Sequence, residues 1–565
     1  MNWLDNFIYI DIETTGLDVV TDHIIGIGCY NFEYDYYTND YAVIKELCET
    51  KSIIAHNGAF DCSFINKAWG TDYKVTLDST ILGYLNDPSD KLTGLKHILK
   101  RDLKIQPYNE ETLGFTNAQG KRAKSIAETF HVFKHPELYD KEQLLLLESI
   151  MQEYMKKDVI YGVDYVNYCV EHFNQIQWDY AYFLSDIYNI FNNDLQPYYL
   201  DQEALQEAIN TYSAKASSLK NKLLYSNSQL NLNSSKQLVE HIEKRLGLEI
   251  KELTGKGAKS TSSGSVMEML RRYPEVQWLR DLLEYRKANK LLNDFLLKWQ
   301  GLGSFKPKFN VVGTRTGRCS CSNPNAQQIP RELKGLYTAP KGYKLIEADY
   351  SQIELRVVAQ LAQIDKMLEA FALGEDLHSV TAREFYGKDF TKEQRTIGKT
   401  ANFSLLYGTS PQTFHTFLLN NGVKVELIDS YKLHKKFHKI YPEIQQYTSY
   451  VANKLAEKHC VFSMMGRQYK VDNYEYASNR KGCERAAMNF TVQSLASDIL
   501  LNSLQALTRH TRYMIDFYLV GTVHDSILLY VREDKVEEYK VIIEDIMCNT
   551  IKLPDIDIKV DVEVR

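Results

Sequence analysis

The stretch Leu345-Ile-Glu-Ala-Asp349-Tyr-Ser-Gln-Ile-Glu354-Leu-Arg356 places one acid after an apolar segment and a second acid five residues later. The run Tyr343-Lys-Leu-Ile346 predicts a strand that leads into Asp349. A single acid in such a place is most often an ordinary strand-end residue. Its meaning depends on which other residues accompany it along the chain.

A second candidate acid, Asp525, lies in Gly521-Thr-Val-His524-Asp525-Ser526-Ile-Leu-Leu-Tyr530, and its apolar flanks predict a hairpin. Phosphoryl transfer to a triphosphate needs divalent ions that bridge the phosphates and carboxylates that hold those ions rigidly. Asp349 and Asp525 together suit such a two-metal site.

The segment between these acids contains the most regular pattern of the chain. Thr391-Lys-Glu-Gln394 is typical of a capping box, and Gly408 is typical of a helix stop. Four side chains between them share one helix face through their spacing of four residues: Arg395, Lys399, Phe403 and Tyr407. Two cations followed by two aromatic rings match the order of a triphosphate, a sugar and a base. A helix with a basic surface end and a buried aromatic end is the simpler alternative.

The composition is that of an ordinary soluble globular protein, with 44% hydrophobic and 25% charged residues. Its 565 residues predict roughly three or four compact units. No segment has the length and apolar content of a membrane helix, no secretory signal is visible, and the nine cysteines lack paired spacing. We therefore expect a cytoplasmic monomer with no membrane partner.

The charge is distributed unevenly. The net charge is −6, yet residues 305–344 hold eight basic residues against one acid, Glu332. An acidic chain with a local basic strip suits an enzyme that binds a polyanion at one place. A solvated basic face is the equally simple alternative.

The first 170 or so residues alternate strand-like and helical patterns, which predicts an α/β domain. Asp11 and Glu13 follow the first apolar run, and strand alternation places both carboxylates on one face. Asp61 follows a second apolar run, while Tyr154 and Asp158 share a helix face through their spacing of four. Like charges gathered in one place favour a bound cation.

These three segments, in this order, resemble the proofreading exonucleases with four acids and a tyrosine. The resemblance implies that Asp11, Glu13, Asp61 and Asp158 hold two divalent metals, and that Tyr154 orients the attacking water. In a two-metal displacement one ion activates the water and the other stabilises the leaving 3′ oxygen. Because all five residues are present, we expect an active 3′→5′ exonuclease that acts on a single-stranded DNA 3′ end.

Residues 300–565 resemble the polymerase domain of the DNA polymerase I family, family A. Further matching segments are Thr316-Gly-Arg318, Asn325-Ala-Gln327-Gln-Ile-Pro330, Asp376-Leu-His378-Ser, Gly466-Arg467, Arg485-Ala-Ala-Met-Asn489-Phe-Thr-Val-Gln493, Ser260-Thr-Ser262 and Glu284-Tyr-Arg286. The fold class implied is multidomain, α/β and α+β, with an RNase H-like exonuclease domain followed by a right-hand polymerase domain. The expected segments are 1–175 (exonuclease), 176–304 (thumb and connecting helices), 305–365 (first part of the palm), 366–440 (fingers) and 441–565 (second part of the palm).

The same resemblance implies a role for each residue of the polymerase site. Asp349 and Asp525 bind catalytic Mg²⁺, and Arg395 and Lys399 hold the triphosphate and stabilise its developing charge. Glu354 lies against the sugar 2′ carbon and excludes ribonucleotides. The other expected nucleotide contacts are Phe403, Tyr407, Gln352 and His378. The expected DNA contacts are Arg318, Asn489 and Gln493 in the minor groove, Arg485, and His524 at the primer end.

The implied cofactors are two Mg²⁺ ions in each site, with Mn²⁺ as a substitute, and the implied partners are primer-template DNA and dNTPs. We expect no thioredoxin-type clamp, because no large insertion interrupts residues 200–300. Ser526 stands where the family commonly has a third acid, so we expect activity with an altered metal preference. Phe403 stands where some phage relatives have tyrosine, and by this analogy we expect discrimination against dideoxynucleotides. The chain opens on the exonuclease segments, so we expect no 5′-nuclease domain and a phage replicative origin.

Three alternatives stay open for experiment. The chain could be a nuclease whose C-terminal half only binds DNA, an RNA polymerase of the same architecture, or a bypass polymerase without proofreading. The first is opposed by Asp349, Asp525, Arg395 and Lys399, the second by Glu354 and the attached exonuclease, and the third by the four N-terminal acids.

Overall fold

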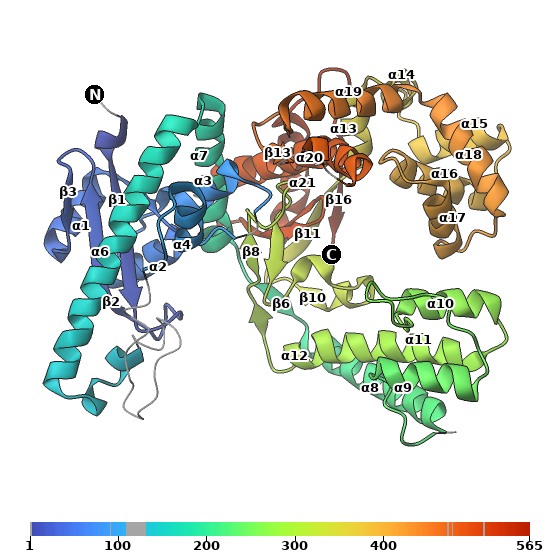
Figure 1. Ribbon diagram of the computed structural model, residues 1–565, viewed down its shortest axis with the longest axis horizontal. Coiled ribbons are helices and arrows are strands. Elements are labelled where there is room, and N and C mark those ends of the chain that lie inside the picture. The colour runs from blue at the N-terminus through green and yellow to red at the C-terminus, as the bar shows by residue number, and fades with distance from the viewer. Residues whose placement is uncertain are drawn as a thin grey trace. The chain divides into compact units, whose positions relative to one another are not determined.

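The computed structural model describes residues 3–90, 92–108, 131–225, 227–471, 474–476, 478–511 and 515–565. The chain divides into two compact units, which can be followed along the colour bar of Figure 1. The first comprises Met1–Gln196, Pro307–Asn323 and Tyr343–Arg565, and the second comprises Pro197–Lys306 and Pro324–Gly342. In none of the described ranges is a helix both long and apolar enough to span a membrane. The five segment boundaries expected from the sequence stay predictions.

The N-terminal part of the first unit is built on a five-stranded sheet in the order β3-β2-β1-β4-β5. Central β1 pairs antiparallel with β2 and parallel with β4. The strands are β1 (Phe7–Thr14), β2 (Ile24–Asn31), β3 (Tyr36–Thr38), β4 (Ser52–Ala55) and β5 (Val75–Asp78). The helices are α1 (Tyr41–Thr50), α2 (Gly58–Trp69), α3 (Ser79–Asn86), α4 (Leu95–Ile98), α6 (Lys141–His172) and α7 (Gln175–Asn189). This mixed sheet with its helices confirms the predicted α/β domain.

The two faces of β1 meet different helices. Ile8 and Ile10 belong to a buried cluster that includes Phe64 of α2. On the other face, a Cβ added to Gly162 of α6 would overlap the ring of Tyr9. Only glycine therefore lets α6 approach β1 this closely. Since side chains alternate along a strand, Asp11 and Glu13 share the face of Tyr9 and look toward α6.

A four-stranded antiparallel sheet in the order β14-β15-β11-β16 forms the C-terminal part of the same unit. The hydroxyl of Tyr350 on β11 hydrogen-bonds to Ser503 Oγ at 2.7 Å and to the Met547 carbonyl at 2.9 Å. This face therefore packs on α20 and α21, and Asp349 points to the other face. The elements are β11 (Tyr343–Tyr350), β14 (Phe517–Val523), β15 (Ser526–Arg532), β16 (Val560–Val564), α20 (Arg480–Thr511) and α21 (Val536–Asn549).

Seven helices follow one another between β11 and residue 458, and α16 among them carries the regular pattern of cations and aromatic rings. They are α13 (Ile353–Ala362), α14 (Asp365–Ala372), α15 (Leu377–Tyr386), α16 (Lys392–Leu405), α17 (Pro411–Asn420), α18 (Leu427–Ile440) and α19 (Glu443–Lys458). Thr391 and Gln394 form the predicted capping box of α16. The helix ends at Leu405, so Tyr407 lies in the turn that leads to Gly408, whose φ is 68°.

Two short antiparallel hairpins complete the strands of the first unit. One pairs β8 (Lys308–Asn310) with β9 (Ser320–Ser322), and the other pairs β12 (Cys460–Phe462) with β13 (Gln468–Lys470). The loop between β8 and β9 carries Arg318.

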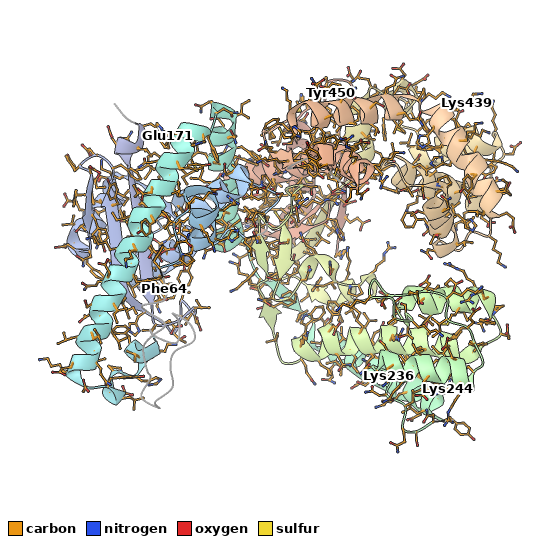
Figure 2. All side chains as sticks on the ribbon, in the orientation of Figure 1. Phe64, Glu171, Lys236, Lys244, Lys439 and Tyr450 are labelled. Carbon is orange, nitrogen blue, oxygen red and sulfur yellow. The ribbon has the colours of Figure 1, made fainter. Side chains whose placement is uncertain are left out.

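The second unit is mainly helical. Its helices are α8 (Gln202–Leu224), α9 (Ser235–Glu240), α10 (Ser263–Arg272), α11 (Gln277–Lys290) and α12 (Leu297–Trp299), and its strands are β6 (Tyr198–Leu200), β7 (Ser304–Phe305) and β10 (Tyr337–Thr338). Leu223, Leu279 and Leu282 lie in its apolar core. Figure 2 labels Lys236 and Lys244, two exposed cations of this unit. The two units together confirm the expected multidomain α/β and α+β class.

Candidate active sites

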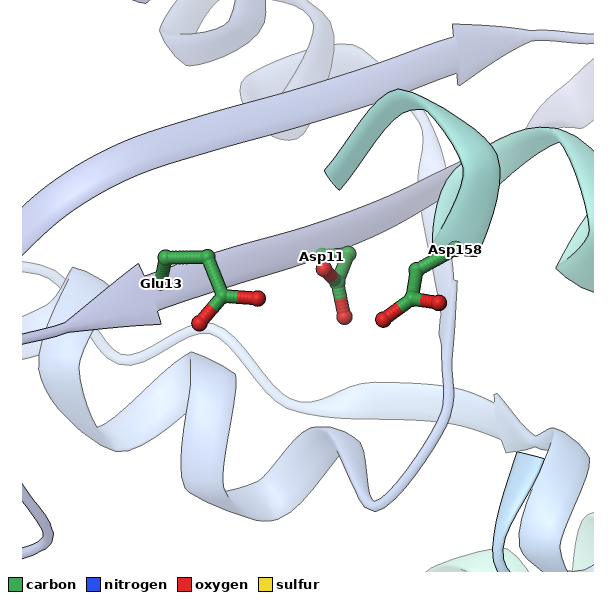
Figure 3. Close-up of side chains that lie close together, drawn as sticks. All are labelled: Asp11, Glu13 and Asp158. Atoms are coloured by element: carbon green, nitrogen blue, oxygen red, sulfur yellow. The ribbon is translucent and has the colours of Figure 1, made fainter. Parts of the chain in front are cut away.

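Three carboxylates meet between β1 and α6 (Figure 3). Ligand atoms of Asp11, Glu13 and Asp158 all lie within 4.8 Å of one another. The fourth predicted acid, Asp61, lies in the first turn of α2, and its Oδ1 accepts a hydrogen bond from the Ile12 N–H of β1 at 3.0 Å. The fold thus brings Asp11 and Glu13 of β1 to Asp158 of α6, and it binds Asp61 to the backbone of the same strand.

Burial makes this cluster electrostatically unfavourable without a cation. Burial, followed by repulsion from Asp158, raises the pKa of Glu13 to about 8. The same two causes raise the pKa of Asp11, and burial raises that of Asp61 to about 8. Asp11 Oδ2 is buried and finds no hydrogen-bond donor among the described residues. Such an oxygen set fits Mg²⁺ or another hard divalent cation.

A lysine and a tyrosine that sequence reasoning missed also belong to this site. Lys96 Nζ lies 3.0 Å and 3.1 Å from the two carboxylate oxygens of Asp158, and it donates to the Tyr154 hydroxyl. The Tyr108 hydroxyl donates to Asp158 Oδ1. Burial and the Asp158 charge raise the pKa of both tyrosines, so both stay protonated. No periodic pattern marked Lys96, which lies in the one-turn helix α4.

The second candidate site is a pocket of about 480 Å³ in the C-terminal part of the first unit. Acidic, basic, amide and aromatic side chains from distant parts of the sequence line it together. The sequence-predicted residues in its lining are Arg318, Asp349, Gln352, Glu354, His378, Lys399, Phe403, Gln493, His524 and Asp525.

Two of the three acids of this pocket, Asp349 and Asp525, lie where β11 meets the β14–β15 turn. Asp349 is opposite Ser526 in the strand register, and the Tyr350 N–H donates to the Asp525 carbonyl at 3.1 Å. His524 has a φ of 55°, the left-handed region, which makes the turn tight. Burial raises the pKa of Asp525, while the Arg318 guanidinium opposes that rise.

Glu354 is held by Arg318, which lines the pocket with it, and by Tyr407, which is not among the lining residues. Arg318 Nη2 donates to its Oε1, and the Tyr407 hydroxyl donates to its Oε2 at 2.5 Å. Burial and the Glu354 charge raise the pKa of Tyr407, which therefore remains a donor. Gln352 precedes α13 with a φ of 55°, so the chain turns sharply between Asp349 and Glu354.

The side chains on one face of α16 have different surroundings: some line the pocket, and Arg395 forms an ion pair instead. Lys399 and Phe403 line the pocket, and the Phe403 ring centre lies 5.3 Å from that of His378. Burial lowers the pKa of His378 to about 4, so its ring is neutral. Arg395 does not line the pocket, because its Nε donates to Asp376 Oδ2 at 2.8 Å.

The predicted DNA contacts on α20 are also divided. Gln493 lines the pocket, whereas Asn489 and Arg485 do not. Asn489 Oδ1 is buried without a donor in the part of the chain that the structure describes. The side chain of Arg485 packs on Gly408. A Cβ atom added to Gly408 would lie only 3.2 Å from Arg485 Cδ, so the two residues are in close contact.

Ser526, which directly follows Asp525, is buried beside another carboxylate. The single proton of its hydroxyl has two acceptors within reach, the Val523 carbonyl at 2.9 Å and Glu347 Oε1 at 3.4 Å. Glu347 lies two residues before Asp349 on the same face of β11. Its Oε2 pairs with Arg565. Sequence reasoning had not selected Glu347.

Comparison with known proteins identifies relatives along the whole chain. Residues 202–565 match the family model "DNA polymerase family A". The chain is 26% identical to DNA polymerase I of Aquifex aeolicus, over 99% of this chain and 94% of that protein. It is 32% identical to DNA polymerase I of Pseudomonas aeruginosa, over 55% of this chain but only 35% of that longer protein.

A solved structure shares the fold. It is the POL domain of Pol1 from M. smegmatis in complex with DNA primer-template and dNTP, with a TM-score of 0.75 and 19% identity, covering 100% of this chain and 96% of that one. The family model spans well over half of the residues and includes every residue that lines the pocket. The chain therefore belongs to DNA polymerase family A.

Proposed function

We propose that this chain extends the 3′ end of a primer with dNTPs under the direction of a template. The observation that carries the proposal is the pocket shared by Asp349, Asp525, Lys399 and Phe403. Two acids, a cation and an aromatic ring are the parts that phosphoryl transfer to a base-bearing triphosphate requires. Membership of family A supports the same activity.

Each polymerase residue has a role in this proposal. Asp349 and Asp525 hold two Mg²⁺ ions, which neutralise phosphate charge when bound. Lys399 binds the triphosphate, and Arg395 joins it by exchanging the Asp376 carboxylate for a phosphate oxygen. Glu354 closes the wall beside the sugar. The remaining proposed contacts are Phe403, Tyr407, Gln352 and His378 to the nucleotide, and Arg318, Asn489, Gln493, Arg485 and His524 to DNA.

Glu354 is suited to its proposed role because both of its oxygens are engaged. Arg318 and Tyr407 fix the carboxylate from two sides, so it cannot move aside easily for a 2′ hydroxyl. A ribonucleotide would then meet a rigid wall, and a deoxynucleotide would not. This supports dNTPs as the substrate class. Phe403 remains the basis for expecting discrimination against dideoxynucleotides.

We also propose a 3′→5′ exonuclease at Asp11, Glu13, Asp61 and Asp158. The observation that favours it is the buried cluster of Asp11, Glu13 and Asp158, because crowded carboxylate oxygens suit a hard divalent cation. We propose two Mg²⁺ ions at the four acids, with Mn²⁺ as a substitute. Bound ions supply activation of water and stabilisation of the leaving oxygen. Tyr154 stays protonated and orients the attacking water through its hydroxyl.

Primer extension tests the polymerase proposal. A 5′-labelled primer on a longer template is incubated with the protein and Mg²⁺, with and without dNTPs. We expect elongation to the end of the template with dNTPs, and shortening from the 3′ end without them. Shortening under both conditions would favour a nuclease that only binds DNA. Equal elongation with ribonucleotides would favour an RNA polymerase.

A further inference from the structure

Lys96 places a cation inside the N-terminal acid cluster. Its Nζ is 3.0 Å and 3.1 Å from the two oxygens of Asp158, and the side chains are 24% and 9% exposed, respectively. The ammonium also lies 4.4 Å from the ring centre of Tyr154 and 5.1 Å from that of Tyr108. A carboxylate and two aromatic rings therefore hold this ammonium, and it remains partly open to solvent.

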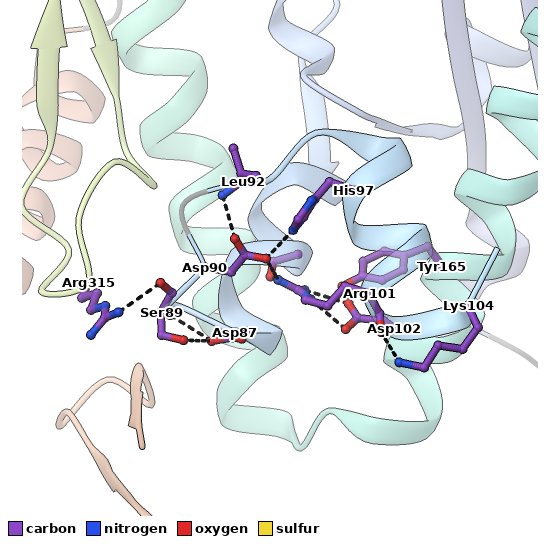
Figure 4. Close-up of polar contacts among 11 residues, drawn as sticks. Asp87, Ser89, Asp90, Leu92, His97, Arg101, Asp102, Lys104, Tyr165 and Arg315 are labelled. Atoms are coloured by element: carbon purple, nitrogen blue, oxygen red, sulfur yellow. Dashed lines mark hydrogen bonds and ion pairs between the residues drawn. The ribbon is translucent and has the colours of Figure 1, made fainter. Parts of the chain in front are cut away.

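The segment that carries Lys96 is fixed to the helices around it (Figure 4). Arg101, in the helical turn that continues α4, donates to the Gly83 carbonyl of α3 at 3.0 Å and to Asp102 Oδ1 at 2.8 Å. The Tyr165 hydroxyl of α6 donates to Asp102 Oδ2 at 2.8 Å. These contacts anchor the backbone of Lys96 between α3 and α6, so its side chain is presented to the cluster by the fold itself.

In the proposed reaction, one negative charge remains that Lys96 could balance. Four carboxylates and two divalent ions cancel, which leaves the negative charge of the scissile phosphodiester unbalanced. More negative charge spreads over the phosphoryl oxygens in the transition state. A lysine or arginine preorganised at such oxygens commonly stabilises the transition state. Lys96 is a cation that the chain itself supplies at this place.

On the basis of the proposed exonuclease, we propose that Lys96 is a catalytic residue of that site. Its ammonium pairs with Asp158 in the free protein and moves to a non-bridging oxygen of the scissile phosphate when DNA binds. In the reaction, the oxygen of water bonds to phosphorus while the bond to the 3′ oxygen of the preceding nucleotide breaks. The water gives up one proton to solvent, and the departing 3′ oxygen takes one from solvent. Lys96 takes no part in these proton transfers and acts only by placing its ammonium at the phosphate oxygen.

Three variants separate this role from a structural one. Lys96→Met removes the charge and keeps a long side chain, and Lys96→Arg restores the charge. Lys100→Met is the matched control, because Lys100 is exposed one turn further along the same helical segment. Single-turnover hydrolysis of a 5′-labelled single-stranded oligonucleotide is measured with Mg²⁺. Primer extension by each preparation reports its folding.

We expect Lys96→Met to slow hydrolysis by about 100- to 1000-fold, the usual effect of removing one transition-state contact. Lys96→Arg should recover most of the rate, and Lys100→Met should match the unmodified chain. An unchanged rate for Lys96→Met would overturn the proposal.

Binding of Mn²⁺ without DNA gives a second readout. Paramagnetic resonance titration is performed in an Asp349→Ala background, which removes a ligand of the other site. We expect Lys96→Met to bind Mn²⁺ more tightly, because the ammonium that competes for Asp158 is gone. Slow hydrolysis together with weakened Mn²⁺ binding would contradict the proposal, since Lys96 would then only organise the acids. An unmodified chain that leaves the oligonucleotide intact would instead contradict the exonuclease itself.

Discussion

The two candidate sites differ in how much positive charge accompanies their carboxylates. Between β1 and α6, Asp11 and Glu13 crowd against Asp158, and burial with mutual repulsion raises the pKa values of both. In the C-terminal pocket, Asp349 and Asp525 share the walls with Arg318 and Lys399. The first site therefore has one lysine, Lys96, beside its crowded carboxylates, whereas the second has two cations in its wall.

This difference follows from what each site is proposed to bind. A triphosphate brings several negative charges, so a polymerase pocket benefits from cations of its own in addition to Mg²⁺. A single phosphodiester brings one negative charge, so four carboxylates with two metal ions need little more than Lys96. The contrast predicts that a substitution in one site changes the activity of that site alone. It also predicts that a bound metal ion stabilises the N-terminal site more than the C-terminal pocket.

The largest expected effect is a reciprocal loss of activity. Asp349→Ala should reduce primer extension at least about a hundredfold and leave 3′ degradation intact, because the two sites use different carboxylates. Asp11→Ala should do the reverse. Extension and degradation are measured on the same preparations with one labelled primer. Loss of both activities in either folded variant would break the separation of the sites.

A smaller effect is expected at the wall of the polymerase pocket. Glu354→Ala should raise the use of ribonucleotides relative to deoxynucleotides by roughly 10- to 100-fold, the range that a change of pocket shape commonly gives. The ratio of kcat/KM for the two nucleotide types measures it. Degradation of DNA should not change. An unaltered ratio would refute the role of Glu354 as a wall against the 2′ hydroxyl.

The charge imbalance of the N-terminal site predicts a pH-dependent stability. The pKa of Glu13 is about 8 in the folded chain against an ordinary value of 4.5. Between these values the folded state binds more protons than the unfolded state, so stability of the metal-free chain falls as pH rises from 4.5 to 8. Glu13→Gln should therefore melt a few degrees higher at pH 8 and equally at pH 4.5.

Calorimetry in the presence of a chelator measures the two melting temperatures. Added Mg²⁺ should narrow the difference in melting temperature between Glu13→Gln and the unmodified chain at pH 8. Lower stability of Glu13→Gln at that pH would contradict the imbalance, because it would mean that the carboxylate is already compensated in the metal-free chain.

The smallest effect is expected at Ser526. Its hydrogen bond to Glu347 is long, at 3.4 Å, and a bond of this kind contributes at most about 1 kcal/mol, or about fivefold in rate. Ser526→Ala should thus lower kcat/KM for dNTPs by no more than about fivefold. Steady-state extension with Mg²⁺ and with Mn²⁺ measures it. A loss as large as that of Asp349→Ala would show that Ser526 is essential to the pocket.

Features that depend on neighbouring residues could be predicted from the sequence. The capping box at Thr391 and Gln394 is present where predicted, since it depends only on neighbouring residues. Strand alternation placed Asp11 and Glu13 on one face of a strand. Only the family resemblance implied that Asp158 joins them, and the structure brings the three carboxylates together. The four-residue spacing of α16 also holds for Lys399 and Phe403, which both line the pocket.

Contacts between distant segments were not predictable in the same way. Lys96 reaches Asp158 from a helix of one turn, which leaves no periodic signal. Glu347 looks like an ordinary strand residue until the strand register brings it to Ser526. The pairing of Arg395 with Asp376 depends on how two helices pack. In the same way, the sequence does not show that residues 324–342 belong to the second unit. The chain leaves that unit at Lys306, passes through the first unit as residues 307–323, and then rejoins the second.

The most direct test of two separate sites is the fate of a primer with a mismatched 3′ end. The unmodified chain should first shorten this primer and then extend it, whereas it should extend a matched primer at once. Asp11→Ala should extend the matched primer at the normal rate, and it should leave the mismatched end in place. Direct extension of the mismatched primer by the unmodified chain, without prior shortening, would contradict the account.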